Sequence, residues 1–96
     1  MVNLGLFVRL EAAPGREEDL ANFLRGAQSL VAAEPGTIVW YAIRFGPSTF
    51  GIFDAFENEQ GRADHLNGAV AQGLASNADL FAGPPTIEQV DVLAST

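Results

Sequence analysis

The sequence predicts an α+β fold of six elements in the order β-α-β-β-α-β. Three observations predict it: apolar residues that alternate with a period of two, two stretches with helical spacing, and pairs of proline and glycine between them. Because connections are short and β-α-β crossovers are right-handed, this order predicts a ferredoxin-like antiparallel sheet with two helices on one face. The 96 residues are expected to form one domain, residues 1–96.

The first part of the chain predicts a strand followed by a helix. Leucine and valine alternate with other residues over 4–11, and Pro14-Gly15 ends that strand. Apolar residues from Leu20 to Val31 then recur at helical spacing. Three acidic residues at 17–19 lie in the first turn of this helix, where the helix dipole favours negative charge. A proline-glycine pair ends the helix.

The second part of the chain predicts a hairpin, a helix and a last strand. β-branched and aromatic residues predict strands over 37–45 and 49–56, and the short segment between them makes a hairpin. One continuous helix is expected over 59–81, weakened by three glycines. A glycine followed by two prolines ends it, and the last strand is expected over 86–94.

Composition excludes several classes of function. The formal charge of −7 repels phosphate groups, so no nucleic acid and no membrane surface is expected as a partner. The absence of cysteine excludes disulfides and thiolate chemistry, and a single histidine leaves no expected metal site. The chain starts with neither a signal-peptide pattern nor an apolar stretch long enough to span a bilayer, so a cytoplasmic location is expected.

The strands are apolar on both faces, although two helices can cover only one face of the sheet. In the first strand Leu6 and Val8 point to one side and Phe7 to the other, and in the second strand Trp40 and Tyr41 point to opposite sides. A solvated sheet face would be largely polar. We therefore expect the uncovered face to pack on a second copy of the chain, forming a homodimer.

Three segments carry a resemblance to a known family: residues 13–18, the Glu-Pro-Gly-Thr turn at 34–37, and residues 54–65. Together they resemble the antibiotic biosynthesis monooxygenase domain of the dimeric α/β-barrel superfamily. The resemblance implies a ferredoxin-like subunit, a dimeric barrel and a ligand cavity between sheet and helices. It also implies oxidation of aromatic quinols or anthrones by molecular oxygen without metal or flavin, so no cofactor is expected, although many members have no established activity.

Haem degradation, which some relatives carry out, is not expected. Those relatives use an asparagine on the first strand and a tryptophan and a histidine on the second helix. When the motifs are aligned, this chain has Val8, His65 and Ala75 at those three positions, so the residue that binds haem in these relatives is missing.

His65 and Asp54 are the candidate catalytic residues. His65 is the only histidine, has an ordinary pKa of about 6.5 and matches the family's helix histidine. On one continuous helix it lies at the rim of the apolar stripe, and the alternative role is a histidine bonded to a carbonyl or to water. Asp54 lies in an apolar strand, where burial disfavours the charged carboxylate and suits a general base. The alternative for Asp54 is an ion pair with Arg9 or Arg44.

Four further residues are candidates for substrate binding. Trp40 and Tyr41 could each stack on a flat ligand, and the alternative is a place in the core or in an interface. Arg62 and Asn67 flank the apolar stripe of the second helix and could orient a polar group, or they could be solvated.

The resemblance, taken together with these residues, implies a cofactor-independent monooxygenase that acts on a small aromatic or quinol-like molecule. A base would remove a phenolic proton, and the resulting anion would react with oxygen in an apolar enclosure. If His65 is the base, the rate should rise with pH near neutrality. The competing hypothesis is a non-catalytic small-molecule-binding or stress-related dimer with the same fold, favoured if His65 faces solvent and Asp54 pairs with an arginine.

Overall fold

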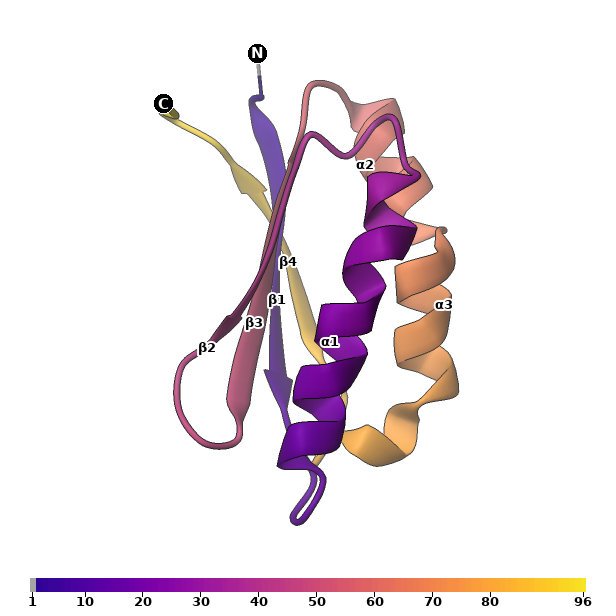
Figure 1. Ribbon diagram of the computed structural model, residues 1–96. Coiled ribbons are helices and arrows are strands. Elements are labelled where there is room, and N and C mark those ends of the chain that lie inside the picture. Colours follow the sequence, from indigo (N-terminus) through magenta and orange to yellow (C-terminus); the bar gives the residue numbers. More distant parts are fainter. Residues whose placement is uncertain (1) are drawn as a thin grey trace.

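Four antiparallel strands form the sheet in the computed structural model, which describes residues 2–96 (Figure 1). The strands are β1 (Leu4–Glu11), β2 (Val39–Arg44), β3 (Thr49–Phe56) and β4 (Thr86–Asp91). Their order across the sheet is β2-β3-β1-β4, with β1 in the middle beside β3 and β4. This arrangement confirms the predicted ferredoxin-like α+β fold. The predicted limits of β2 and β4 were too wide, because pairing ends at Arg44 and at Asp91.

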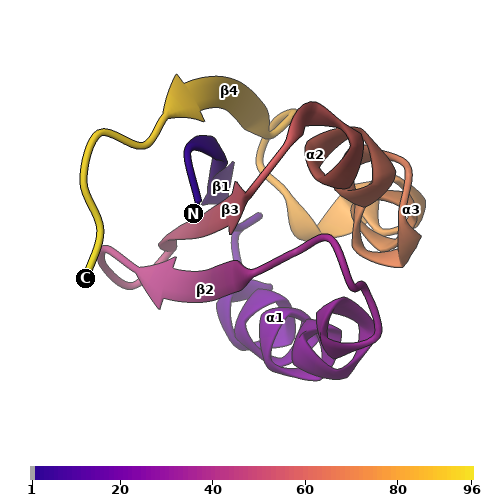
Figure 2. The same ribbon diagram turned by 90° about the horizontal axis from the view of Figure 1, so that it is seen from above.

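All helices cover the same face of the sheet (Figure 2). They are α1 (Glu17–Ala32), α2 (Glu59–Leu66), α3 (Ala69–Ser76) and a short 3-10 helix η1 (Ala78–Leu80). None of the helices within residues 2–96 has the length and apolar character needed to cross a membrane.

The prediction of one continuous helix over 59–81 was wrong, because the helix is interrupted at Asn67 and Gly68. Asn67 ends α2, and its side-chain amide bonds back to the carbonyl of Ala63. Gly68 is extended and begins α3. The buried residues of α2 are Gly61 and His65, one helical turn apart. The predicted position of His65 at the rim of the stripe was therefore also wrong, because that stripe assumed that α2 and α3 share one axis.

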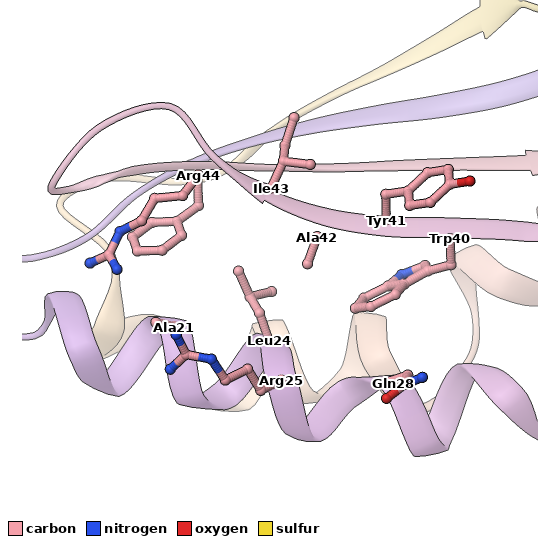
Figure 3. Close-up of a pocket in the computed structure, with 10 residues that line it drawn as sticks. Ala21, Leu24, Arg25, Gln28, Trp40, Tyr41, Ala42, Ile43 and Arg44 are labelled. Carbon is pink, nitrogen blue, oxygen red and sulfur yellow. The ribbon is translucent and has the colours of Figure 1, made fainter.

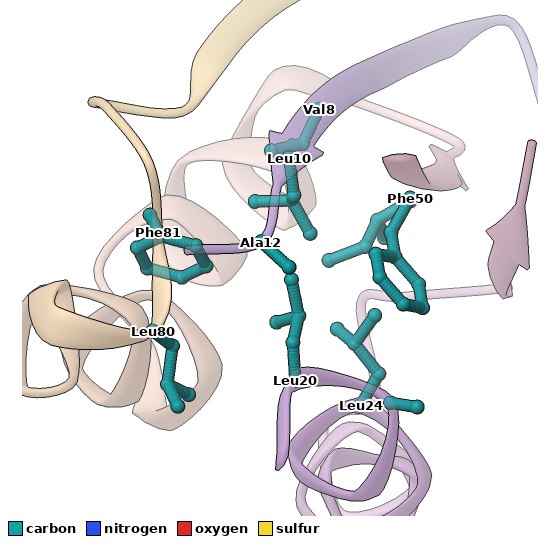
Figure 4. Packing of buried hydrophobic residues seen from close by; sticks show 10 residues of the cluster. Val8, Leu10, Ala12, Leu20, Leu24, Phe50, Leu80 and Phe81 are labelled. Atoms are coloured by element: carbon teal, nitrogen blue, oxygen red, sulfur yellow. The ribbon is translucent and has the colours of Figure 1, made fainter. Parts of the chain in front are cut away.

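The hydrophobic core lies between the sheet and the helices (Figure 4). Its main cluster consists of Val8, Leu10, Ala12, Leu20, Ala21, Leu24, Phe50, Ile52, Leu80 and Phe81. A smaller cluster joins α1 to α3 through Ala27, Val31 and Val70, and the partly buried Trp40 packs against both clusters. The helices and the sheet thus enclose a packed interior on one side of the sheet only.

Two glycines, Gly61 in α2 and Gly68 after its end, lie against the turn that follows α1. A Cβ atom on Gly61 would lie 2.8 Å from the carbonyl oxygen of Gly36, and one on Gly68 would lie 2.7 Å from a carboxylate oxygen of Glu34. Gly61 therefore requires glycine for close approach to the Gly36 backbone, whereas the atom nearest Gly68 is the end of the flexible Glu34 side chain, which could move. Two of the three glycines that were expected to weaken the helix over 59–81 therefore lie where the turn that contains Glu34 packs against it.

The other face of the sheet is apolar and is not covered within residues 2–96. The backbone register places Tyr41, Phe53 and Phe7 in one row across β2, β3 and β1. Tyr41 is 61% exposed and Phe45 is 52% exposed. Two-sided apolar strands, predicted from the sequence, are therefore confirmed, and we call this surface the open face.

Candidate functional site

Three elements bring a carboxylate, an imidazole and a second carboxylate into contact beneath the helices. Asp54 points from β3 toward the helices and is 1% exposed. His65 Nε2 on α2 lies 2.9 Å from Asp54 Oδ2. On the other side of the ring, His65 Nδ1 lies 2.6 Å from Oε1 of Glu34, which stands in the turn after α1. The chain therefore places its only histidine between two acids.

Neighbouring groups hold the histidine and the outer acid in place. The hydroxyl of Thr37 donates a hydrogen bond of 2.8 Å to Glu34 Oε1 and lies 3.5 Å from His65 Nδ1. The ring of Phe56 packs at a centroid distance of 5.6 Å from the imidazole. These contacts restrict the rotation of the His65 ring, so the imidazole stays aimed at Asp54.

The electrostatics of this cluster favour a charged histidine. Burial alone would lower the pKa of His65, but its contacts with Asp54 and Glu34 outweigh burial and raise that pKa to about 9. At neutral pH the cluster is therefore an imidazolium between two carboxylates. The expected titration of His65 near neutrality is corrected upward, because the sequence did not show that two acids face this ring.

Asp54 retains unused hydrogen-bonding capacity. The 2.9 Å contact with His65 is short enough for an ion pair. Its direction does not meet hydrogen-bond geometry, and neither carboxylate oxygen accepts a hydrogen bond from residues 2–96. A buried carboxylate that accepts no hydrogen bond favours a ligand or a water molecule that donates a hydrogen bond to it.

Neither arginine that was the alternative partner of Asp54 reaches it, so that alternative was wrong. The guanidinium of Arg9 lies on the open face, 4.6 Å from the ring centroid of Phe45. Arg44 faces the helices but pairs with Glu18 at 2.9 Å.

An apolar cavity of about 30 Å³ touches both Asp54 and His65. It is lined by these two residues and by Leu6, Val8, Ile52, Leu66, Val70, Ala71, Leu74 and Ile87. A space of this size holds a water molecule but no aromatic ring. Ala71, Leu74 and Ile87 also line a neighbouring apolar pocket of about 490 Å³, formed by α3, β4 and the segment between them. The two spaces share a wall, so a ring in the larger pocket would lie next to the smaller cavity.

Two of the predicted substrate-binding residues lie on opposite faces of β2, as expected. Trp40 points toward the helices and is the cross-strand neighbour of Asp54, whereas Tyr41 lies on the open face. Trp40 and Tyr41 both line a different pocket, between α1 and β2. The structure therefore does not bring either of them to the Asp54 cavity.

Arg62 and Asn67 are not aimed at the Asp54 cavity. Arg62 pairs with Glu59 at 3.6 Å and donates to the carbonyl of Gly5 at 3.4 Å. The side chain of Asn67 bonds to the carbonyl of Ala63. Their contacts account for structural roles, because Arg62 joins α2 to β1 and Asn67 caps the end of α2.

Glu34 is the site residue that the residue-by-residue reasoning missed. The only signal was its place in the Glu-Pro-Gly-Thr turn. That turn was part of the family resemblance, but no chemical role was assigned to Glu34. No group of three or more histidine, cysteine or acidic residues within 2–96 is arranged to hold a metal ion.

Comparison with solved structures places the chain in a family. The crystal structure of NE2512, a protein of unknown function from Nitrosomonas europaea, is 56% identical over 100% of this chain and 94% of its own, with a TM-score of 0.98. The chain belongs to the NE2512 family. No model of a known protein family matches the sequence, and no curated protein matches it.

More distant structures share the fold of this family. A "putative antibiotic biosynthesis monooxygenase" from Nitrosomonas europaea is 18% identical with a TM-score of 0.85, over 98% of this chain and 93% of its own. A protein of the same description from Caulobacter crescentus CB15 is also 18% identical, with a TM-score of 0.81, over 97% of this chain and 92% of its own. The resemblance seen in the sequence is thus confirmed at the level of the fold.

The ion cluster makes the stability of this protein depend on pH. Because the pKa of His65 is raised from about 6.5 to about 9 on folding, its stabilisation is complete below pH 6.5 and is lost as pH rises through 9. The shift corresponds to about 3 kcal/mol. We expect the free energy of unfolding, measured by urea titration, to fall by an amount of this order between pH 6 and pH 10.

The matched control is His65→Gln, which removes the titrating group from between the two acids. Its free energy of unfolding should be lower at pH 6 and nearly flat over the same pH range. The chain has neither lysine nor cysteine that would titrate in this range. An equal pH dependence in the wild type and in this variant would contradict the assigned ion cluster.

Proposed function

We propose that this protein is a cofactor-independent monooxygenase that acts on a small aromatic or quinol-like molecule. The observation that carries the proposal is the buried Asp54 carboxylate, which faces an apolar cavity and accepts no hydrogen bond from residues 2–96. Direct oxygenation of a phenol requires a proton acceptor, an apolar enclosure and positioning. Asp54 would be the proton acceptor, and the larger apolar pocket beside its cavity has room for the ring. The fold shared with the proteins described as monooxygenases supports the same reaction class.

The neighbouring apolar pocket is the proposed place of the aromatic ring. Its volume of about 490 Å³ lies in the range of small-molecule sites. Leu74 and Ile87 line both this pocket and the Asp54 cavity. A ring bound there would direct its hydroxyl past Leu74 to Asp54, after a side-chain rotation that opens the shared wall.

In the proposed reaction Asp54 removes the phenolic proton. The anion then transfers electrons to dioxygen, and a ring carbon ortho or para to the phenolic oxygen, one that carries a hydrogen, forms a carbon–oxygen bond. The resulting peroxide takes back the proton from Asp54, which gives a hydroperoxide. Loss of the proton on that carbon breaks the oxygen–oxygen bond. One oxygen atom remains as a new carbonyl group, and the other leaves with the two protons as water.

The charge state of the cluster assigns different roles to the two predicted catalytic residues. Since the pKa of His65 is raised to about 9, His65 carries a proton at neutral pH and cannot act as the base. We assign the base to Asp54, and to His65 the stabilisation of negative charge on the substrate and the peroxide. Activity should then decline above pH 9, rather than rise through neutrality.

The test is oxygen consumption by chelator-treated protein with a panel of quinols and anthrones. The proposal expects one molecule of oxygen consumed for each molecule of product, with one atom of isotopically labelled dioxygen in the new carbonyl. Leu74→Phe should raise KM by filling the shared wall. Release of hydrogen peroxide without label in the product would contradict the monooxygenase.

A non-catalytic small-molecule-binding protein is the second candidate. The observation that favours it is that the acids flanking His65 are already paired with its charge and that only about 30 Å³ lies beside them. Tight binding of an aromatic ligand without oxygen consumption by any compound of the panel would favour this function.

We also propose that the protein forms a homodimer through the open face, as two-sided apolar strands favour. The proposed partners are therefore a second copy and a small aromatic molecule. Neither nucleic acid nor a membrane surface is proposed, since the formal charge is −7.

A further inference from the structure

A second pocket, of about 380 Å³, lies between α1 and the edge strand β2 (Figure 3). The residues of β2 that face the helices are Trp40, Ala42 and Arg44, because they share their rows with the helix-facing residues of β3. A small alanine thus stands between two large side chains. The gap lies between Ala42 of β2 and Leu24 of α1 (Figure 3). Within residues 2–96, this pocket shares no lining residue with the Asp54 cavity.

One end of this pocket is positively charged. Arg25 and Arg44 both line it, and in Figure 3 their side chains extend toward the same end. Arg44 uses one guanidinium nitrogen for Glu18 and for the carbonyl of Pro47. Arg25 donates a hydrogen bond to the neutral side chain of Asn22 in the same helix. The hydrogen bond with Arg44 lowers the pKa of Glu18, and the charge of Arg25 adds to that effect. Glu18 offsets one of the two guanidinium charges, so this end of the pocket keeps one positive charge for a single anion in a chain whose formal charge is −7.

The opposite end carries a donor without a partner. The Nε1 group of Trp40 is buried and makes no hydrogen bond with residues 2–96. A buried indole N–H ordinarily has a partner, so its position favours an acceptor supplied by a ligand. Gln28 lies at the same end in Figure 3 and offers a second polar group.

We propose that this pocket is a binding site for a planar aromatic carboxylate that carries a hydroxyl or carbonyl at its far end. The carboxylate would pair with Arg25 and Arg44, the rings would lie over Ala42 and Leu24, and the far oxygen would accept from Trp40 Nε1. Trp40 and Arg44 are four residues apart in an extended strand, or about 13 Å. This separation suits two fused rings better than one. The site is separate from the proposed oxygenation and does not depend on it.

The test uses the single tryptophan of the chain as its own reporter, because nitrogen-labelled protein gives one indole N–H resonance. The probe is a hydroxynaphthoate whose carboxylate and hydroxyl lie at opposite ends of the rings. We expect a saturable shift of the indole resonance. The corresponding hydroxynaphthamide, which lacks the charge, should bind at least about tenfold more weakly.

Matched variants separate this site from general electrostatics and from the Asp54 cavity. Arg25→Gln should weaken binding of the probe about tenfold or more, whereas Arg16→Gln, which removes an equal charge from an exposed ion pair with Asp19 and Asp79, should leave it unchanged. Ala42→Leu should abolish binding by filling the gap. Leu74→Phe, in the other pocket, should have no effect.

Three results would overturn the proposal. The first is no saturable shift at millimolar probe. The second is an equal loss of affinity in Arg25→Gln and Arg16→Gln, which would mean that the probe senses only net charge. The third is a loss of binding in Leu74→Phe with normal binding in Ala42→Leu, which would place the probe beside Asp54. If Ala42→Leu fails to fold, the comparison of Arg25→Gln with Arg16→Gln and the comparison of the probe with the neutral hydroxynaphthamide still test the proposal.

Discussion

Asp54→Asn is expected to lower the turnover of a proven substrate by about 10²–10⁴-fold, the usual contribution of a positioned base. The amide keeps the shape of the side chain but accepts no proton. It also removes one of the two charges that raise the pKa of His65, so that pKa should fall toward its ordinary value. Steady-state kinetics of the variant should therefore show a lower kcat and a decline of activity that begins at lower pH.

Two variants define what this result means. His65→Ala should also lower turnover by about 10²–10⁴-fold, since the imidazolium stabilises the anion that the base creates. Asp64→Asn makes the same chemical change at an exposed position of α2 and should leave kcat and its pH dependence unaltered. Unaltered kinetics in Asp54→Asn would remove Asp54 from the mechanism, and with it the proposed route of the proton.

Most of the fold could be predicted from the sequence because its strands are strongly patterned. Alternation over 4–11 and the turn at 46–48 are local signals, and each corresponds to a strand or to the hairpin in the structure. The break between α2 and α3 could not be predicted from glycine alone. Gly61 is tolerated inside α2 because it packs against Gly36, whereas Gly68 begins a new helix. Two glycines with the same propensity thus have different outcomes, and tertiary contacts decide between them.

The candidate site could be predicted only in part, because local sequence signals indicate its residues but not the tertiary contacts between them. The sequence indicated Asp54 and His65 separately, through an acid in an apolar strand and a lone histidine. Their contact depends on the rotation of α2, which follows from the break after Leu66. Glu34 is 31 residues away from His65 in the chain, and the two side chains approach to 2.6 Å where the turn after α1 packs against α2, with Gly36 next to Gly61. No local sequence pattern could predict the contact between Glu34 and His65.

Phe7→Asp is expected to convert a dimer into a monomer, or to prevent folding, by placing a charge in the proposed interface on the open face. Phe7 lies in the middle of that face, on the central strand, and its ring meets Phe45 edge-on at a centroid distance of 6.4 Å. In a twofold interface each substitution occurs twice. An unpaired buried charge costs several kcal/mol, on the order of 3–5 for each one. Sedimentation equilibrium at micromolar concentration should therefore give twice the monomer mass for the wild type and the monomer mass for the variant.

A second substitution separates association from folding. Tyr41 is on the same face but is 61% exposed in the subunit, so Tyr41→Asp removes little from the core and should leave the subunit folded while weakening the dimer. Leu30→Asp is the control, because Leu30 is an equally apolar, exposed residue of α1 on the opposite side of the sheet. Its circular dichroism and its dimer mass should both resemble the wild type. A wild-type protein that sediments as a monomer would contradict the interface, and it would leave the row of Tyr41, Phe53 and Phe7 without an explanation.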